Sequence, residues 1–156
     1  MEEEAWSIVL EGRRIIRSGG RLHSKGSAQV PSRLRKSLLN RIDREIPVIF
    51  KSEAAMLPGS KTHIEHVTPM KRIAIEIIDP SAHDPRTVGG GPAGLGPARD
   101  LLHAVEIART MIVKALVTQE EHALINRSGV SLQWDAPAKD ILARYHTAGV
   151  CLVPVD

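Results

Sequence analysis

Apolar residues recur every three to four positions in four stretches of this chain, and a helix is the structure that places residues with this spacing on one face. The second stretch begins at Ser32, a residue type that caps helices, and its stripe consists of Leu34, Leu38, Leu39 and Ile42. The spacing predicts helices over 5–17, from Ser32 onward, over 69–79 and over 98–116. The last residues of the fourth stretch suit a strand equally well.

Turn and capping residues divide the rest of the chain into short elements. Thr118 and Glu121 have the spacing of a capping box, which predicts a fifth helix that stops at Gly129. Asp135 begins a sixth helix, which ends at Gly149. Short apolar or alternating runs predict strands at 47–51, 61–67 and 150–153. Together these elements predict a helix-rich α+β fold with two or three short strands.

Length and composition indicate how the chain is organised. The 156 residues fall within the usual size of one domain, about 100 to 200 residues, so we expect residues 1–156 to form a single domain. Two Gly-rich stretches, at about 18–31 and 80–97, are expected to be flexible loops. Only 3% of the residues are aromatic, which argues against a stacking platform for single-stranded nucleic acid. Trp134 and Tyr145 are expected to anchor the packing of the C-terminal segment.

The single cysteine and the N-terminus bear on the cellular compartment. Cys151 has no partner for a disulfide within the chain, and its apolar neighbours predict a buried, inert thiol. Met1 is followed by three glutamates where a signal peptide would carry basic residues. No apolar run approaches the ~18 residues that a membrane span requires. We therefore expect a cytoplasmic protein that is not inserted in a membrane.

Positive charge is concentrated in the first third of the chain, although the formal net charge is only +3. Nucleic acid is the commonest partner of such a surface, because Lys and Arg that neutralise phosphates release counterions. We expect DNA in preference to RNA. An acidic protein surface, or a solvated helix face without a polyanionic partner, is the alternative. The candidate nucleic-acid-binding residues are Arg33, Arg35, Lys36, Arg41 and Arg44.

One short motif, Ile64-Glu65-His66-Val67-Thr68-Pro69, points to chemistry. It resembles the first half of the motif of the HNH, or ββα-metal, nuclease superfamily, in which an acidic residue and a histidine end a strand. The resemblance implies a ββα-metal-like element around residues 47–79, with Glu65 as a metal ligand and His66 as the general base that activates water. In this chemistry the metal stabilises charge on the scissile phosphate while a neutral imidazole accepts the proton of the water. On an extended strand His63 shares a face with Glu65, so it could orient Glu65 or supply another ligand.

The second half of the HNH motif, an Asn followed by a further His or Asn, has no match downstream of Pro69. Ligands for a divalent ion (Mg²⁺, Mn²⁺ or Zn²⁺) must then be sought among other residues. His103 lies one helical turn from both Asp100 and Glu106, a spacing that places neighbours on one helix face. Solvated polar side chains on an amphipathic helix have the same spacing. The candidate metal ligands are Glu65, His63, His83 with the neighbouring Asp84, and His103.

Two functions follow from these observations. The first is an HNH-like, divalent-metal-dependent endonuclease in which His66 is the general base and the basic N-terminal third holds nucleic acid. The second is a non-enzymatic regulator or inhibitor of phage or mobile-element origin, which binds nucleic acid or an acidic protein surface through the same basic third. The second function requires no complete HNH motif.

Overall fold

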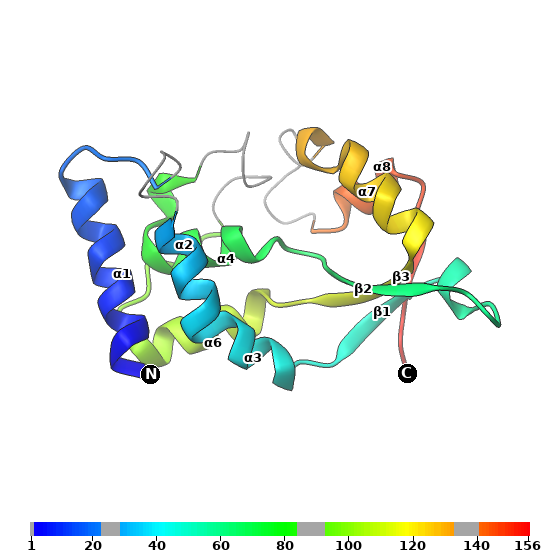
Figure 1. The fold of residues 1–156 in the computed structure, drawn as a ribbon, viewed down its shortest axis with the longest axis horizontal. Helices are drawn as coiled ribbons and strands as arrows, with labels where there is room; N and C mark the ends of the chain where they lie inside the picture. Colours follow the sequence, from blue (N-terminus) through cyan, green and yellow to red (C-terminus); the bar gives the residue numbers. More distant parts are fainter. Residues whose placement is uncertain (1, 23–28, 84–92, 133–140) are drawn as a thin grey trace.

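The computed structural model describes residues 2–22, 29–83, 93–132 and 141–156, and these form a helical half and a half built on a sheet (Figure 1). The predicted helix-rich α+β fold is confirmed. The helical half contains α1 (Glu2–Arg17), α2 (Gln29–Leu34), η1 (Arg35–Leu39), α3 (Asn40–Glu45), α4 (Met70–Ile78), η3 (Pro80–Ala82) and α6 (Leu101–Met111). The other half contains β1 (Val48–Ser52), η2 (Ala54–Met56), β2 (Thr62–His66), β3 (Lys114–Thr118), α7 (Gln119–Leu132), α8 (Ala143–Thr147) and β4 (Leu152–Pro154).

Helix α4 lies inside the helical half. Its apolar residues were predicted to form one stripe, but eight of its nine residues are buried, because α1, α2, η1 and α6 all contact it. The buried residues include two that carry charge, Arg72 and Glu76. A buried charge is tolerated only where hydrogen bonds or an opposite charge compensate for the lost water. The surroundings of α4 must therefore supply polar groups to these two side chains.

The second predicted helix begins three residues earlier than Ser32. Helix α2, the π-helical stretch η1 and helix α3 follow one another without interruption from Gln29 to Glu45. Ser32 consequently lies inside the helix and does not cap it, which corrects the prediction. The apolar stripe itself is confirmed, because its four residues are all buried in the core of the helical half: Leu34, Leu38, Leu39 and Ile42.

The sheet has the strand order β2-β3-β1-β4. Strand β3 pairs antiparallel with β2 and parallel with β1, and β4 pairs antiparallel with β1. Because β3 lies between β1 and β2, the two strands within residues 47–79 do not pair with each other. A hairpin of the ββα-metal type is therefore not formed there. The end of the 98–116 stretch was predicted to suit a strand as well as a helix, and β3 confirms the strand. The sheet has four strands, whereas two or three were predicted.

Helices α7 and α8 cover one face of the sheet (Figure 1). A second core lies between them and the sheet, and Tyr145 is fully buried in it, as predicted. The predicted capping box is also confirmed: Glu121 N donates to Thr118 Oγ1 (3.1 Å), and Thr118 N donates to Glu121 Oε2 (2.8 Å). Strand β3 therefore passes directly into α7, and the first turn of α7 is held beside the sheet.

Several predicted boundaries are wrong. Helix α4 starts at Met70 with Pro69 as its N-cap, so Pro69 is not the first helical residue. Helix α7 continues through Gly129 to Leu132. Cys151 is exposed rather than buried, because it lies just before β4, an edge strand of the sheet.

Some predictions fall on residues outside the described ones, namely Asp84, Trp134, Asp135, residues 23–28 of the 18–31 loop and residues 84–92 of the 80–97 loop. The described parts of these two loops correct the prediction at two places, because residues 29–31 belong to α2 and residues 80–82 to η3. None of the helices in the described part of the chain combines the length and apolar composition that crossing a bilayer requires.

Candidate metal site

Strand β2 brings His63 and Glu65 to the same face of the sheet, as the alternation of side chains along a strand predicts. The register pairs Glu65 with Ala115 and His63 with Val117, and both of these β3 residues belong to the core under α7 and α8. Glu65 is buried, whereas 45% of the His63 side chain is exposed. The Glu65 carboxylate therefore lies toward the core, and the His63 imidazole lies toward the solvent.

The first turn of α7 adds His122 to this pair. The Nδ1 atom of His122 makes a short hydrogen bond to Glu65 Oε2, and His63 Nε2 lies 3.8 Å from the same oxygen. The two imidazole rings are 3.9 Å apart between centroids and tilted by 35°. One potential ligand atom from each residue lies within 4.8 Å of the other two. His63, Glu65 and His122, which we call the His-Glu-His group, could therefore hold a metal ion.

Two further side chains orient this group. Asn126, one turn after His122 on α7, places its Nδ2 atom 3.0 Å from His122 Nε2. When this amide donates to Nε2, Nδ1 is the nitrogen that faces Glu65, and it would give up its proton to bind a metal ion. On the opposite side of the carboxylate, Arg144 Nη2 lies 3.4 Å from Glu65 Oε1. Each oxygen of Glu65 therefore has its own neighbours: the imidazoles at Oε2 and the guanidinium at Oε1.

The composition of the His-Glu-His group limits the ions that it suits. Imidazole is a good ligand for Zn²⁺ and the other later transition metals, whereas Mg²⁺ prefers an all-oxygen octahedron. Structural zinc sites are closed by four protein ligands, but catalytic ones have three and keep a position open for water or substrate. The group offers three ligands, and its histidines are 45% and 34% exposed for His63 and His122. This arrangement is typical of an open site.

His66, the predicted general base, lies on the other face of β2. It pairs in register with Lys114, and its Nε2 atom is 2.9 Å from Asp43 Oδ1 of α3. Lys114 Nζ donates to the backbone oxygen of Asp43 (2.7 Å). These contacts join the sheet to the helical half, and the His66 ring faces away from the side of the strand that carries Glu65.

The other two predicted ligands also lie apart from the His-Glu-His group. His83 Nε2 is 3.1 Å from Glu76 Oε2, and both side chains are buried in the helical half. At the start of α6, Asp100 accepts a hydrogen bond from His103 N, and His103 Nδ1 accepts one from Arg99 N (3.1 Å). Of the four predicted metal ligands that lie among the described residues, the structure brings together Glu65 and His63 only.

Sequence reasoning missed His122. This residue is 57 positions from Glu65, and the two meet only because β2 pairs with β3 and β3 leads directly into α7. A signal was present nevertheless. The capping box at Thr118 places His122 in the first turn of a helix that follows a strand. A histidine there can reach a neighbouring strand of the same sheet.

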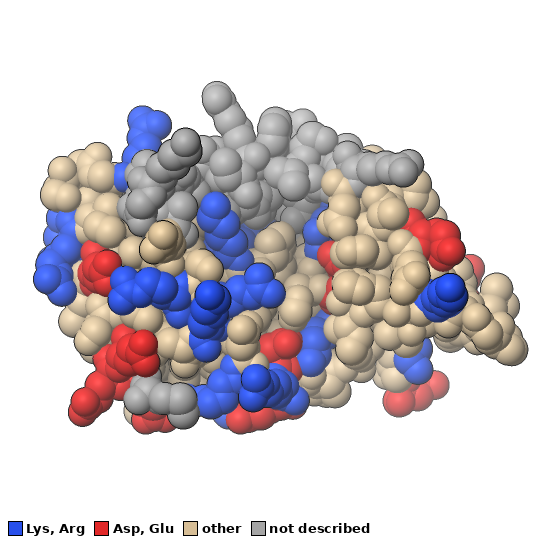
Figure 2. All heavy atoms as spheres, in the orientation of Figure 1, with Lys and Arg blue, Asp and Glu red and all other residues tan. Residues whose placement is uncertain are grey.

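The predicted basic residues lie on the surface of α2, η1 and α3. Figure 2 shows Lys and Arg side chains gathered over this part of the helical half, with acidic side chains among them. Arg33 is paired with Glu11 (2.7 Å) and Arg41 with Glu2 (3.5 Å). The exposed members that form no ion pair with another described residue are Arg35, Lys36 and Arg44.

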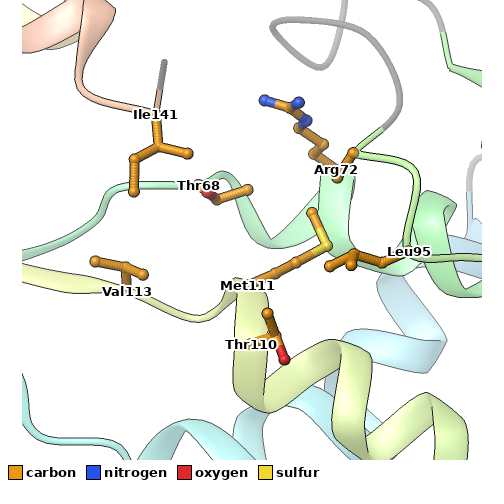
Figure 3. Close-up of a pocket in the computed structure, with 8 residues that line it drawn as sticks. Thr68, Arg72, Leu95, Thr110, Met111, Val113 and Ile141 are labelled. Carbon is orange, nitrogen blue, oxygen red and sulfur yellow. The ribbon is translucent and has the colours of Figure 1, made fainter. Parts of the chain in front are cut away.

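A small cavity lies where the two halves meet. Its volume is about 170 Å³, and Figure 3 shows Thr68, Arg72 and Met111 among the side chains that line it. Most of the lining is apolar, and burial lowers the pKa of Arg72 although nearby Glu76 acts in the opposite direction. None of the lining residues belongs to the His-Glu-His group, so the cavity and the candidate metal site are separate features.

Comparison of the chain with protein-family models, with curated proteins and with solved structures gives no match.

Proposed function

We propose that this protein binds one divalent transition-metal ion at His63, Glu65 and His122 and uses it to hydrolyse phosphodiester bonds of nucleic acid. The observation that carries the proposal is the convergence of two imidazoles and a carboxylate from β2 and α7 within 4.8 Å of one another. Three ligands with solvent access leave room for a water molecule and a substrate oxygen. When bound, the metal lowers the pKa of its water and stabilises charge on the phosphate.

The ligand set favours Zn²⁺ over Mg²⁺, because two of the three ligands are nitrogen atoms. Mn²⁺, the other transition metal of the three, binds such a site less tightly than Zn²⁺. The resemblance to the HNH superfamily supports Glu65 as a ligand. It gives less support to His66 as the base, since the His66 ring contacts Asp43 on the other face of β2. In our proposal, deprotonation of water depends on the metal rather than on His66.

The basic surface of α2, η1 and α3 supports nucleic acid as the substrate, with DNA as the first to be tested. Arg35, Lys36 and Arg44 are the residues we propose to contact phosphates, because they are exposed and form no ion pair within the described residues. Contacts to phosphates position a nucleic acid without reading its sequence. Reversal of charge at Arg35 and Lys36 is therefore expected to weaken binding for all sequences alike and to reduce its dependence on salt.

One observation favours the second function, a non-enzymatic regulator that binds nucleic acid or an acidic protein surface. The basic residues belong to the helical half, whereas the His-Glu-His group belongs to the sheet half (Figure 1). In a binding protein these two features need not serve one substrate. The metal would then stabilise the contact between β2 and α7.

A cleavage assay separates the two functions. Supercoiled plasmid and single-stranded DNA are incubated with the protein and Zn²⁺, Mn²⁺, Mg²⁺ or EDTA. We expect nicking with Zn²⁺ or Mn²⁺ that is lost in Glu65→Gln and His122→Ala and kept in His66→Ala and His103→Ala, the matched histidine controls. Loss in His66→Ala with full activity in His122→Ala would contradict this assignment. DNA binding without nicking under all conditions would favour the regulator.

A further inference from the structure

Arg144 of α8 is placed directly behind Glu65. Its side chain is only 9% exposed, and its Nη2 atom lies 3.4 Å from Glu65 Oε1. The same nitrogen donates to the backbone oxygen of His66 and lies 3.4 Å from the hydroxyl of Tyr145. The guanidinium is therefore held by three acceptors, of which two belong to the end of β2.

The two oxygens of Glu65 differ in what they face. Oε2 is the atom that His122 Nδ1 and His63 Nε2 approach, and Oε1 is the atom that Arg144 approaches. A carboxylate can bind a metal ion through one oxygen or through both. An arginine keeps its charge at any accessible pH, so its contact with Oε1 persists whatever the state of the histidines.

We infer that Arg144 is a positioning residue, which occupies Oε1 and restricts Glu65 to binding the metal through Oε2 alone. This inference rests on the metal centre of the proposed function. By holding one carboxylate oxygen, Arg144 keeps a coordination position open for water or a substrate oxygen. It acts through Glu65 and does not itself contact the metal or the substrate.

A purely structural role for Arg144 has different consequences. The guanidinium also connects α8 with the end of β2 through the His66 backbone oxygen, so its removal will lower stability. A change in stability therefore does not distinguish the two roles. The number of Glu65 oxygens bound to the metal does, because only a positioning residue controls it.

Co²⁺ is the probe, because its visible absorption weakens several-fold as its coordination number rises. The wild-type protein, Arg144→Met and Arg144→Lys are titrated with Co²⁺ at neutral pH, and Arg109→Met serves as the control, since Arg109 forms an exposed pair with Glu45. We expect intense absorption for the wild type and Arg109→Met. We expect several-fold weaker absorption for Arg144→Met, with recovery in Arg144→Lys, whose charge is retained.

X-ray absorption spectroscopy of the wild-type Co²⁺ complex provides a test that requires no variant to fold. One carboxylate oxygen in the metal shell is expected. Two carboxylate oxygens from Glu65, or a spectrum unchanged in Arg144→Met, would overturn the positioning role and leave the metal centre intact. No Co²⁺ binding by the wild-type protein would instead overturn the proposed function, and this inference with it.

Discussion

Replacement of Glu76 by glutamine removes a buried negative charge from the middle of α4. The carboxylate is fully buried and accepts hydrogen bonds from three backbone N–H groups, those of Ala93 (2.9 Å), Leu95 (2.8 Å) and Gly96 (3.0 Å). His83 Nε2 adds a fourth contact at 3.1 Å. Glu76 therefore joins α4 to the segment at 93–96, and the variant tests how much stability this charge contributes.

The magnitude follows from the pKa of Glu76. Burial by itself raises this pKa, but the hydrogen bonds from His83 and the three backbone groups outweigh burial and lower it from 4.5 to about 2. At about 1.4 kcal/mol per pKa unit, the difference corresponds to about 3 kcal/mol of folding free energy. Because the pKa is lower in the folded state, this stability is fully present above about pH 5 and is lost as the pH falls toward about 2.

Urea unfolding measured at a series of pH values tests this reasoning. We expect Glu76→Gln to be less stable than the wild type at pH 7, and the difference in unfolding free energy to shrink by about 3 kcal/mol between about pH 6 and pH 2. Glu120→Gln, at an exposed glutamate of α7, is the matched control and should show no such change. The reasoning would be refuted if the unfolding free energies of the wild type and of Glu76→Gln changed with pH in parallel.

Three further outcomes are expected. Gly96→Ala should destabilise the fold by about 3 kcal/mol in urea unfolding, because an added Cβ would lie 1.8 Å from the backbone oxygen of Glu76. Normal stability of this variant would show that the backbone moves away from the added carbon. Thr118→Ala should cost about 1 kcal/mol through loss of the cap at Glu121 N, and Thr118→Ser should cost less; equal losses would mean that the hydroxyl is not the stabilising group. The exposed thiol of Cys151 should react with a thiol reagent in the native protein as fast as in urea, whereas strong protection would contradict its exposure.

The helices with long apolar stripes could be predicted because spacing along one helix is a local property. Leu34, Leu38 and Ile42 are buried as their spacing indicates. The predictions are wrong where contacts between distant parts of the chain determine the type or the burial of an element. Strand β3 has apolar residues that also fit a helix, and it is a strand because β1 and β2 pair with it on either side. Helix α4 is buried on more sides than its predicted stripe, because α1, α2, η1 and α6 all pack against it.

Only part of the candidate site could be predicted, for the same reason. His63 and Glu65 lie two residues apart on one strand, so alternation alone places them on one face. His122 depends on the pairing of β2 with β3, which no local pattern specifies. The general-base assignment of His66 came from a resemblance in sequence, and the fold turns that side chain toward Asp43. The general-base role of His66 stays an untested prediction, and the cleavage assay of His66→Ala tests it.

Calorimetric titration of the metal-free protein with Zn²⁺, with the bound metal counted by mass spectrometry, tests the metal centre most directly. We predict one Zn²⁺ per chain and a Zn²⁺ affinity that falls by more than about 100-fold in His122→Ala. Loss of a residue that only orients a ligand already lowers metal affinity by about 10- to 100-fold, and loss of the ligand itself should lower it further. His103→Ala, which changes a histidine outside the group, should bind Zn²⁺ like the wild type. Equal Zn²⁺ affinity in the wild type and His122→Ala would contradict the assignment of His63, Glu65 and His122 as a metal centre.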